Sequence, residues 1–146
     1  MDTETVFTGQ LGLVLLLGPN TRKQAITIGS RYRNGNSINL GERHEPHVTL
    51  YHSKLQDVPR SMIREFLDDL AVRLPLKLGF THIAPFGRKF LFWDASRSAE
   101  LSGAHGYSLG LSQYFVPVGE QQADRERVEV TEEERINIRR FGHPFV

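Results

Sequence analysis

Hydrophobic residues fall into short blocks along the chain, and their spacing separates strands from helices. An apolar block at residues 11–17, closed by a Gly-Pro pair, predicts a buried strand. A helix capped by Asn20 or Thr21 is expected to run to about Tyr32, because its apolar positions recur every three or four residues. The alternating residues 47–52, which follow a proline, predict a second strand.

The clearest helical period lies between Asp57 and Pro75. Asp57 is expected to cap this helix, Pro59 to open it and Pro75 to end it. Its apolar residues recur over three turns and form one stripe, which we expect to face a sheet. The stripe consists of Met62, Ile63, Phe66, Leu67, Leu70, Ala71 and Leu74.

The following segment predicts a β-hairpin. Residues 76–84 alternate, residues 89–94 are rich in aromatic side chains, and residues 85–88 carry Pro and Gly for the turn. Ser96 or Ser98 is then expected to cap a helix that its glycines weaken by up to about 1 kcal/mol each.

The C-terminal part combines a polar loop with one short helix. Residues 119–127 are polar and predict the loop. Thr131 and Glu134 have the spacing of a capping box, which predicts a helix to about Arg140. The resulting order of elements predicts an α+β fold of split βαβ type in a single domain, residues 1–146.

Composition narrows the classes of function. The formal net charge is +1, so overall charge favours neither nucleic acid nor a membrane surface as the partner. The chain has no cysteine, which excludes disulfides, thiolate catalysis and zinc sites built on sulfur. The acidic start, residues 1–5, is unlike a secretory signal, and the apolar block is far shorter than the about 20 residues that span a bilayer. We therefore expect a soluble, cytoplasmic protein with no membrane contact.

His47 and Thr49 are the strongest candidates for chemistry. Residues two apart on a strand share a face, so an imidazole and a hydroxyl point the same way while Val48 turns to the core. The imidazole can transfer a proton near neutral pH, and the hydroxyl can donate to a phosphate oxygen. From spacing alone, the alternative is a strand with two ordinary exposed polar residues.

The segment Pro-His-Val-Thr-Leu-Tyr-His at 46–52 resembles the first signature of the two-histidine (2H) phosphoesterases, which include bacterial 2′,5′-RNA ligases and cyclic phosphodiesterases. The order of elements around it is similar to that family, as are residues 83–93 and 111–115. The resemblance implies a fold of two similar lobes that each contribute one His-x-Thr/Ser motif. It implies a catalytic acid/base at His47 and a phosphate ligand at Thr49. It also implies that neither metal nor cofactor is required, and that the partner is a small cyclic nucleotide or an RNA end. No obligate protein partner is inferred from the sequence.

The sequence departs from the family pattern at the second motif. None of the other histidines is followed two residues later by Thr or Ser. The ending at 141–146 resembles the segment that leads up to that motif, so a second lobe truncated at the C-terminus is the favoured interpretation, and a natural loss of the histidine is the other. The predicted function is a metal-independent phosphoesterase for 2′,3′-cyclic or 2′,5′-linked ribonucleotides. The alternative is a non-catalytic nucleotide- or RNA-binding module.

The neighbouring sequence gives weaker support to the other candidate functional residues. His44 and His52 flank His47, but strand alternation predicts that His52 faces away from it, and no carboxylate has a metal-ligand spacing, so no metal site is predicted. His82 is read as an ordinary residue, and His105 as a minor candidate for the cleft. Basic side chains could form an RNA-contacting rim or simply a solvated face: Arg88, Lys89, Arg135, Arg139 and Arg140. The aromatic residues Phe90, Phe92 and Trp93 are expected in the core.

Overall fold

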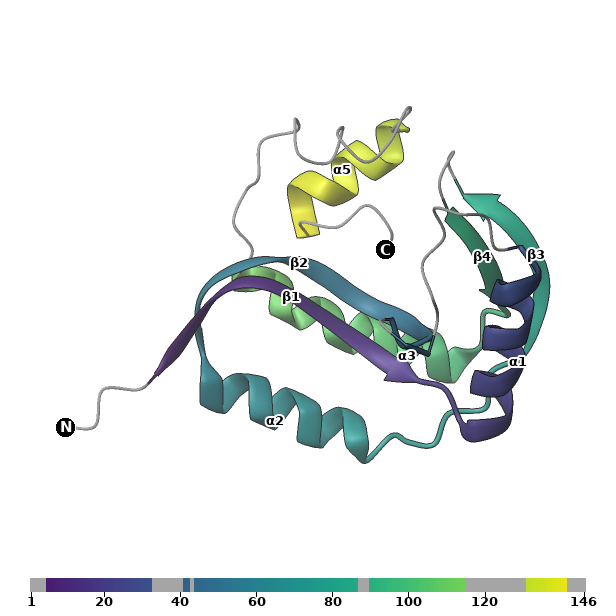
Figure 1. Ribbon diagram of the computed structural model, residues 1–146. Coiled ribbons are helices and arrows are strands. Elements are labelled where there is room, and N and C mark those ends of the chain that lie inside the picture. Colours follow the sequence, from purple (N-terminus) through teal and green to yellow (C-terminus); the bar gives the residue numbers. More distant parts are fainter. Residues whose placement is uncertain (1–4, 33–40, 43, 87–89, 115–130, 142–146) are drawn as a thin grey trace. The chain divides into compact units, whose positions relative to one another are not determined.

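The computed structural model describes residues 5–32, 41–42, 44–86, 90–114 and 131–141 (Figure 1). In this part of the chain the fold is α+β, as expected, with four α-helices and two small antiparallel two-stranded sheets, β1–β2 and β3–β4. The elements are β1 (Val6–Leu16), α1 (Pro19–Arg31), β2 (His47–Pro59), α2 (Arg60–Ala71), β3 (Phe80–Phe86), β4 (Phe90–Ala95), α3 (Ala99–Ser108), the 3₁₀-helix η1 (Leu109–Tyr114) and α5 (Glu132–Phe141).

The chain divides into two compact units, residues 13–50 and residues 1–12 with 51–146. In the first unit, α1 starts directly at Pro19 with Gly18 at the N-cap, and no side chain caps it. The expected cap at Asn20 or Thr21 is therefore wrong. Proline at the first helical position leaves one fewer amide to satisfy and presets the helical φ, so the helix can begin earlier.

β1 is longer than the expected strand at 11–17. The apolar run identified only its second half, where Leu13 and Leu15 are buried. The first half is more polar and alternates between half-buried and exposed residues, a period of two that also indicates a strand. The chain just before β1 is tied to the start of α2, because the Arg60 amide donates to the Thr5 carbonyl over 3.1 Å.

β2 also continues further than expected, to Pro59 instead of His52. Leu50 and Tyr51 are consecutive and both buried, with 1% and 0% exposure. Strict alternation would expose Tyr51 together with Thr49, but the inside–outside pattern shifts by one residue here. His52, the next residue, is exposed.

Asp57 lies within β2 and does not cap the next helix, contrary to the sequence prediction. Its φ is 54°, in the left-handed region that Asp tolerates better than most residues. The Asp57 amide donates to the hydroxyl oxygen of Thr8 over 3.1 Å, and the Thr8 hydroxyl donates to the Asp57 carboxylate over 3.4 Å. A contact 49 residues away in sequence thus takes the place of the local cap.

α2 ends three residues before the predicted Leu74. The amides of Arg73 and Leu74 bond to carbonyls three residues back, so the helix tightens into a terminal turn before Pro75. The predicted apolar stripe is buried only in part. Leu70 is 6% exposed, the side chains of Met62, Ile63 and Phe66 are half-buried, and Leu67 and Leu74 are each 48% exposed.

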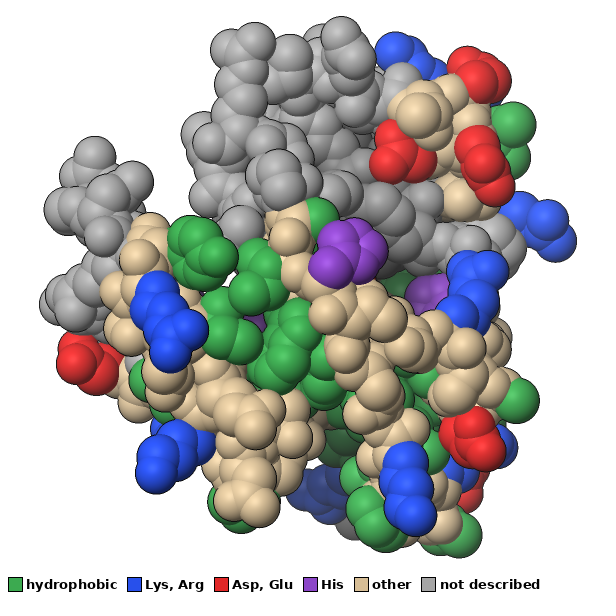
Figure 2. All heavy atoms as spheres, turned by 90° about the vertical axis from the view of Figure 1, so that its right-hand side faces the viewer, with side chains coloured by type: hydrophobic (Ala, Val, Ile, Leu, Met, Phe, Trp, Pro, Cys, Tyr) green, Lys and Arg blue, Asp and Glu red, His purple; other side chains and the backbone are tan. Residues whose placement is uncertain are grey.

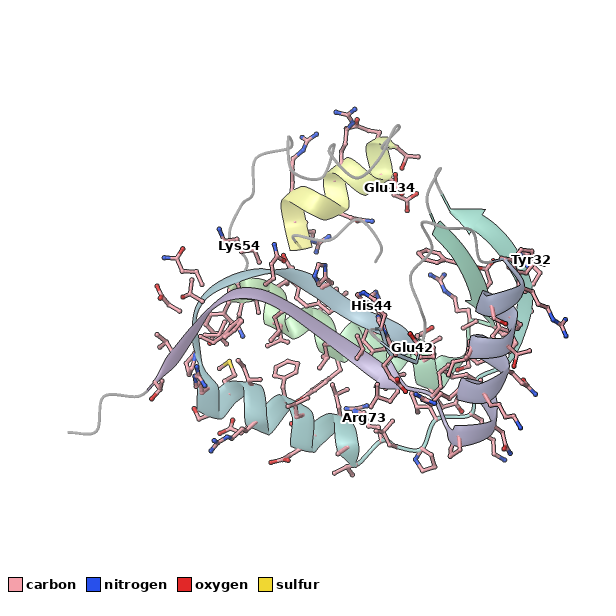
Figure 3. The ribbon with its side chains drawn as sticks, viewed as in Figure 1. Tyr32, Glu42, His44, Lys54, Arg73 and Glu134 are labelled. Atoms are coloured by element: carbon pink, nitrogen blue, oxygen red, sulfur yellow. The ribbon has the colours of Figure 1, made fainter. Side chains whose placement is uncertain are left out.

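α2 packs on α3 through aromatic side chains. The rings of Phe66 and Tyr107 have centroids 4.7 Å apart, and α2 and α3 run side by side in Figure 1. Arg73, labelled in Figure 3, extends from the turn after α2 and places its guanidinium carbon 4.9 Å from the centre of the Tyr107 ring.

The predicted β-hairpin is confirmed, with β3 starting at Phe80 instead of residue 76. β3 and β4 are antiparallel, and Ile83 pairs with Trp93. The Trp93 ring packs on Phe80 with centroids 4.5 Å apart. Phe92, one residue along, turns to the other side and is 44% exposed, so its predicted place in the core is wrong.

Two predicted helix caps are confirmed. Ser98 accepts a hydrogen bond from the Leu101 amide over 3.0 Å at the start of α3. At the start of α5, the Thr131 amide donates to the Glu134 carboxylate over 2.8 Å and the Glu134 amide donates to the Thr131 hydroxyl over 3.2 Å. This reciprocal pair is a capping box.

Some expectations concern segments beyond the described residues. These are the hairpin turn at Gly87-Arg88, the loop at 119–127 and the C-terminal stretch from His143. Among the helices that are described, none is long and apolar enough to cross a membrane.

Candidate functional site

His47 and Thr49 project from the start of β2 in the unit formed by residues 13–50. Both side chains are exposed. Val48 between them is half-buried, and Leu50 is buried. The alternation thus turns the imidazole and the hydroxyl to the open side of the strand and the aliphatic residues to the covered side.

A backbone carbonyl orients the His47 ring. Nδ1 of His47 lies 2.7 Å from the carbonyl oxygen of Glu45. A carbonyl oxygen can only accept, so Nδ1 must carry the proton in this contact. In the neutral ring the lone pair is then on Nε2, which is the nitrogen available to accept a proton from another molecule.

Glu45 is held in turn by Arg22 of α1. Nε of Arg22 donates to one carboxylate oxygen of Glu45, and Nη2 donates to the other over 3.0 Å. The hydrogen bond from Arg22 lowers the pKa of Glu45, and the same bond raises the pKa of Arg22. Sequence inspection missed this pair because its members are 23 residues apart and no local pattern links them.

The segment before β2 approaches the same helix at Gly41. Its φ is 84°, and a Cβ atom there would lie 2.7 Å from Cδ1 of Ile26, so only glycine fits without a shift. The Gly41 amide donates to the His44 carbonyl over 2.8 Å and closes a tight turn. Figure 3 shows Glu42 and His44 projecting from this turn.

In the described part of the chain, no three side chains of His, Asp or Glu gather closely enough to hold an ion. His82 instead pairs with Asp94 across the β3–β4 hairpin, with Nε2 and Oδ2 3.1 Å apart. His105 lies half-buried in α3, and His143 is outside the described residues.

On the face shown in Figure 2, Lys and Arg are scattered, with Asp and Glu in several places between them. On α5, Arg139 is 3.7 Å from the carboxylate of Glu132. Arg88 and Lys89 of the predicted RNA-contacting rim fall outside the described residues.

Comparison with known proteins returns no match among family models, curated proteins or solved structures. The resemblance to the 2H phosphoesterases thus rests on the residues of this chain. Chemically, the local arrangement offers one proton acceptor at Nε2 of His47 and one hydroxyl donor at Thr49 on the same exposed stretch of strand.

Proposed function

We propose that this chain is a metal-independent phosphoesterase of the 2H type, acting on 2′,3′-cyclic or 2′,5′-linked ribonucleotides. The observation that carries the proposal is the state of His47: its side chain is exposed, and Nδ1 is engaged by the Glu45 carbonyl so that Nε2 is the proton acceptor. The exposed hydroxyl of Thr49, two residues along the strand, supplies a donor for a phosphate oxygen.

The reaction assigns a distinct step to each group. Nε2 of His47 takes a proton from an attacking water as its oxygen bonds to phosphorus. The bond from phosphorus to one ribose oxygen then breaks, and in a chain with one histidine motif that oxygen takes its proton from solvent water. Thr49 donates a hydrogen bond to a non-bridging phosphate oxygen and holds the phosphorus in line. In a 2H enzyme, a second histidine protonates the leaving oxygen, and the proposed fold is the two-lobed, split βαβ architecture of that family.

A binding module for nucleotides or RNA ends is the second candidate. It is favoured by the absence of a second His-x-Thr or His-x-Ser sequence among the 146 residues. One imidazole cannot both accept a proton on one side of the phosphorus and donate one on the other at the same moment. A chain with a single histidine motif could therefore bind the substrate and transfer protons poorly.

The test combines binding and turnover in the intact chain. The His47 imidazole resonances would be followed by NMR during titration with a 2′,3′-cyclic nucleotide in EDTA, and ring opening by phosphorus NMR. We expect saturable shifts at His47 and slow hydrolysis that His47→Ala abolishes. His52→Ala is the matched control, because it removes an exposed histidine from the same strand.

The outcomes separate the two candidates. Binding with hydrolysis that requires His47 supports the phosphoesterase. Binding at His47 with no hydrolysis supports the binding module. No shift at His47 with cyclic nucleotides or with 2′,5′-linked dinucleotides contradicts both.

A further inference from the structure

The contacts around His47 extend beyond the residues of the His-x-Thr motif. The Glu45 carbonyl accepts the hydrogen bond from Nδ1 of His47. Glu45 directly precedes Pro46, and Pro46 is buried. A residue that precedes proline is restricted to extended backbone, so the direction of this carbonyl depends on where the Glu45–Pro46 unit is anchored.

Arg22 anchors this unit through the Glu45 side chain. A guanidinium that meets both oxygens of one carboxylate forms a planar fork, which fixes orientation as well as distance. Arg22 lies in the first turn of α1, where its own amide donates to the Gly18 carbonyl over 2.8 Å. The fork therefore starts from a well-defined backbone position.

A second attachment lies one turn further along α1. Ile26 follows Arg22 by four residues, so the two side chains lie on one face of the helix. Both approach Gly41: a Cβ there would be 2.7 Å from Cδ1 of Ile26 and 3.6 Å from Nη2 of Arg22. The segment that leads into β2 is thus held against one face of α1 at two points.

We propose that Arg22 is a positioning residue for His47, acting through Glu45 to hold the carbonyl that sets the orientation and the proton-bearing nitrogen of the imidazole. A role of Arg22 in catalysis rests on the proposed function. The positioning itself is a property of the protein without substrate. Arg22 and Glu45 side chains are 39% and 42% exposed, so the pair is screened by solvent and its loss should leave the fold intact.

The experiment measures the tautomer of His47 in the ligand-free chain by nitrogen NMR of the imidazole ring. In the wild type, we expect the form with the proton on Nδ1 to dominate. Arg22→Gln and Glu45→Gln should each shift the population towards the form with the proton on Nε2. Arg31→Gln is the matched control, because it removes an exposed charge from the end of the same helix.

Exchange of the two charges gives a stricter test. The double variant Arg22→Glu with Glu45→Arg should restore the wild-type tautomer more fully than either single change. Arg22→Lys should keep the wild-type tautomer only in part, because an ammonium cannot form the two-point contact of a guanidinium. Circular dichroism verifies that each variant is folded. An unchanged His47 tautomer in folded Arg22→Gln and Glu45→Gln would overturn the proposal.

The same measurements distinguish a failure of the proposed function from a failure of the positioning role of Arg22. If only the proposed function failed, the tautomer would respond to Arg22, and yet no cyclic nucleotide would shift the His47 resonances of the wild type. If both proposals hold, Arg22→Gln should lower kcat while KM changes little, since Thr49 and the phosphate contacts are retained.

Discussion

The hydroxyl of Tyr107 donates a hydrogen bond to the carboxylate of Asp69 over 2.5 Å and so joins α3 to α2. This bond, followed by burial, raises the pKa of Tyr107. The neutral phenol is therefore favoured in the folded state. The stabilisation is fully present below the ordinary tyrosine pKa of about 10 and is lost as pH rises through the raised value.

The first prediction follows from the loss of this stabilisation at high pH. Tyr107→Phe should lower the urea midpoint near neutral pH, and its difference from the wild type should shrink above about pH 10. Asp69→Asn should remove the same pH dependence, and the double variant should show that the two effects are not additive. The measurement is the urea midpoint from pH 7 to 11. A difference that is constant over this range would show that the hydrogen bond has no role in the titration.

The second prediction compares two leucines on α2. Leu70 is 6% exposed and Leu67 is 48% exposed, so the same substitution removes very different amounts of buried surface. We expect Leu70→Ala to lower the free energy of unfolding by about 2–5 kcal/mol. Leu67→Ala should cost about 1 kcal/mol or less. Denaturant unfolding measures both, and equal losses would contradict the observed orientation of the helix.

The third prediction concerns two glycines. Gly106 lies within α3, and a Cβ there would have open space around it. Gly106→Ala should therefore stabilise the protein by about 0.5–1 kcal/mol through helix propensity.

Gly110 of η1 supplies the contrast. A Cβ there would lie 2.9 Å from Cζ of Phe66, whose ring already packs against Tyr107 in a tilted arrangement. Gly110→Ala should destabilise the protein by about 1–3 kcal/mol through overpacking, and a Phe66→Leu background should relieve that loss. A stabilising Gly110→Ala would show that the ring moves aside freely.

The fourth prediction concerns the proposed proton transfer. One positioned acid or base typically contributes about 10²- to 10⁴-fold, so a site with His47 as its single histidine should be slower than a two-histidine site by about that factor. Added imidazole should accelerate ring opening of a 2′,3′-cyclic nucleotide in proportion to its concentration, above the rate of the imidazole reaction without protein. The acceleration should vanish in His47→Ala. A rate independent of imidazole would indicate that another group of the chain already serves as the acid.

The last prediction concerns the hydroxyl of Thr49. Thr49→Ser keeps the donor and should bind cyclic nucleotides almost as well as the wild type. Thr49→Val keeps the shape without the hydroxyl and should bind about 10-fold or more weakly, as expected for a hydrogen bond to a charged group. The side chain is exposed, so neither change should alter folding. Equal affinities of the two variants would remove Thr49 from the site.

The sequence by itself determined the features that depend on neighbours within one turn or one hairpin. The Ser98 cap, the Thr131–Glu134 capping box and the β3–β4 hairpin were all predictable, because the atoms that satisfy each backbone group belong to residues a few positions away. The exposure of His47 and Thr49 follows from the same local alternation.

Only the tertiary structure decided the features that depend on distant partners. Asp57 bonds to Thr8 instead of capping α2, and the alternation of β2 shifts at Leu50 and Tyr51. Arg22 reaches Glu45 across 23 residues and so anchors the carbonyl that orients His47. These contacts form because the folded chain brings segments together that share no local pattern, and a buried or hydrogen-bonded partner then outweighs the local preference.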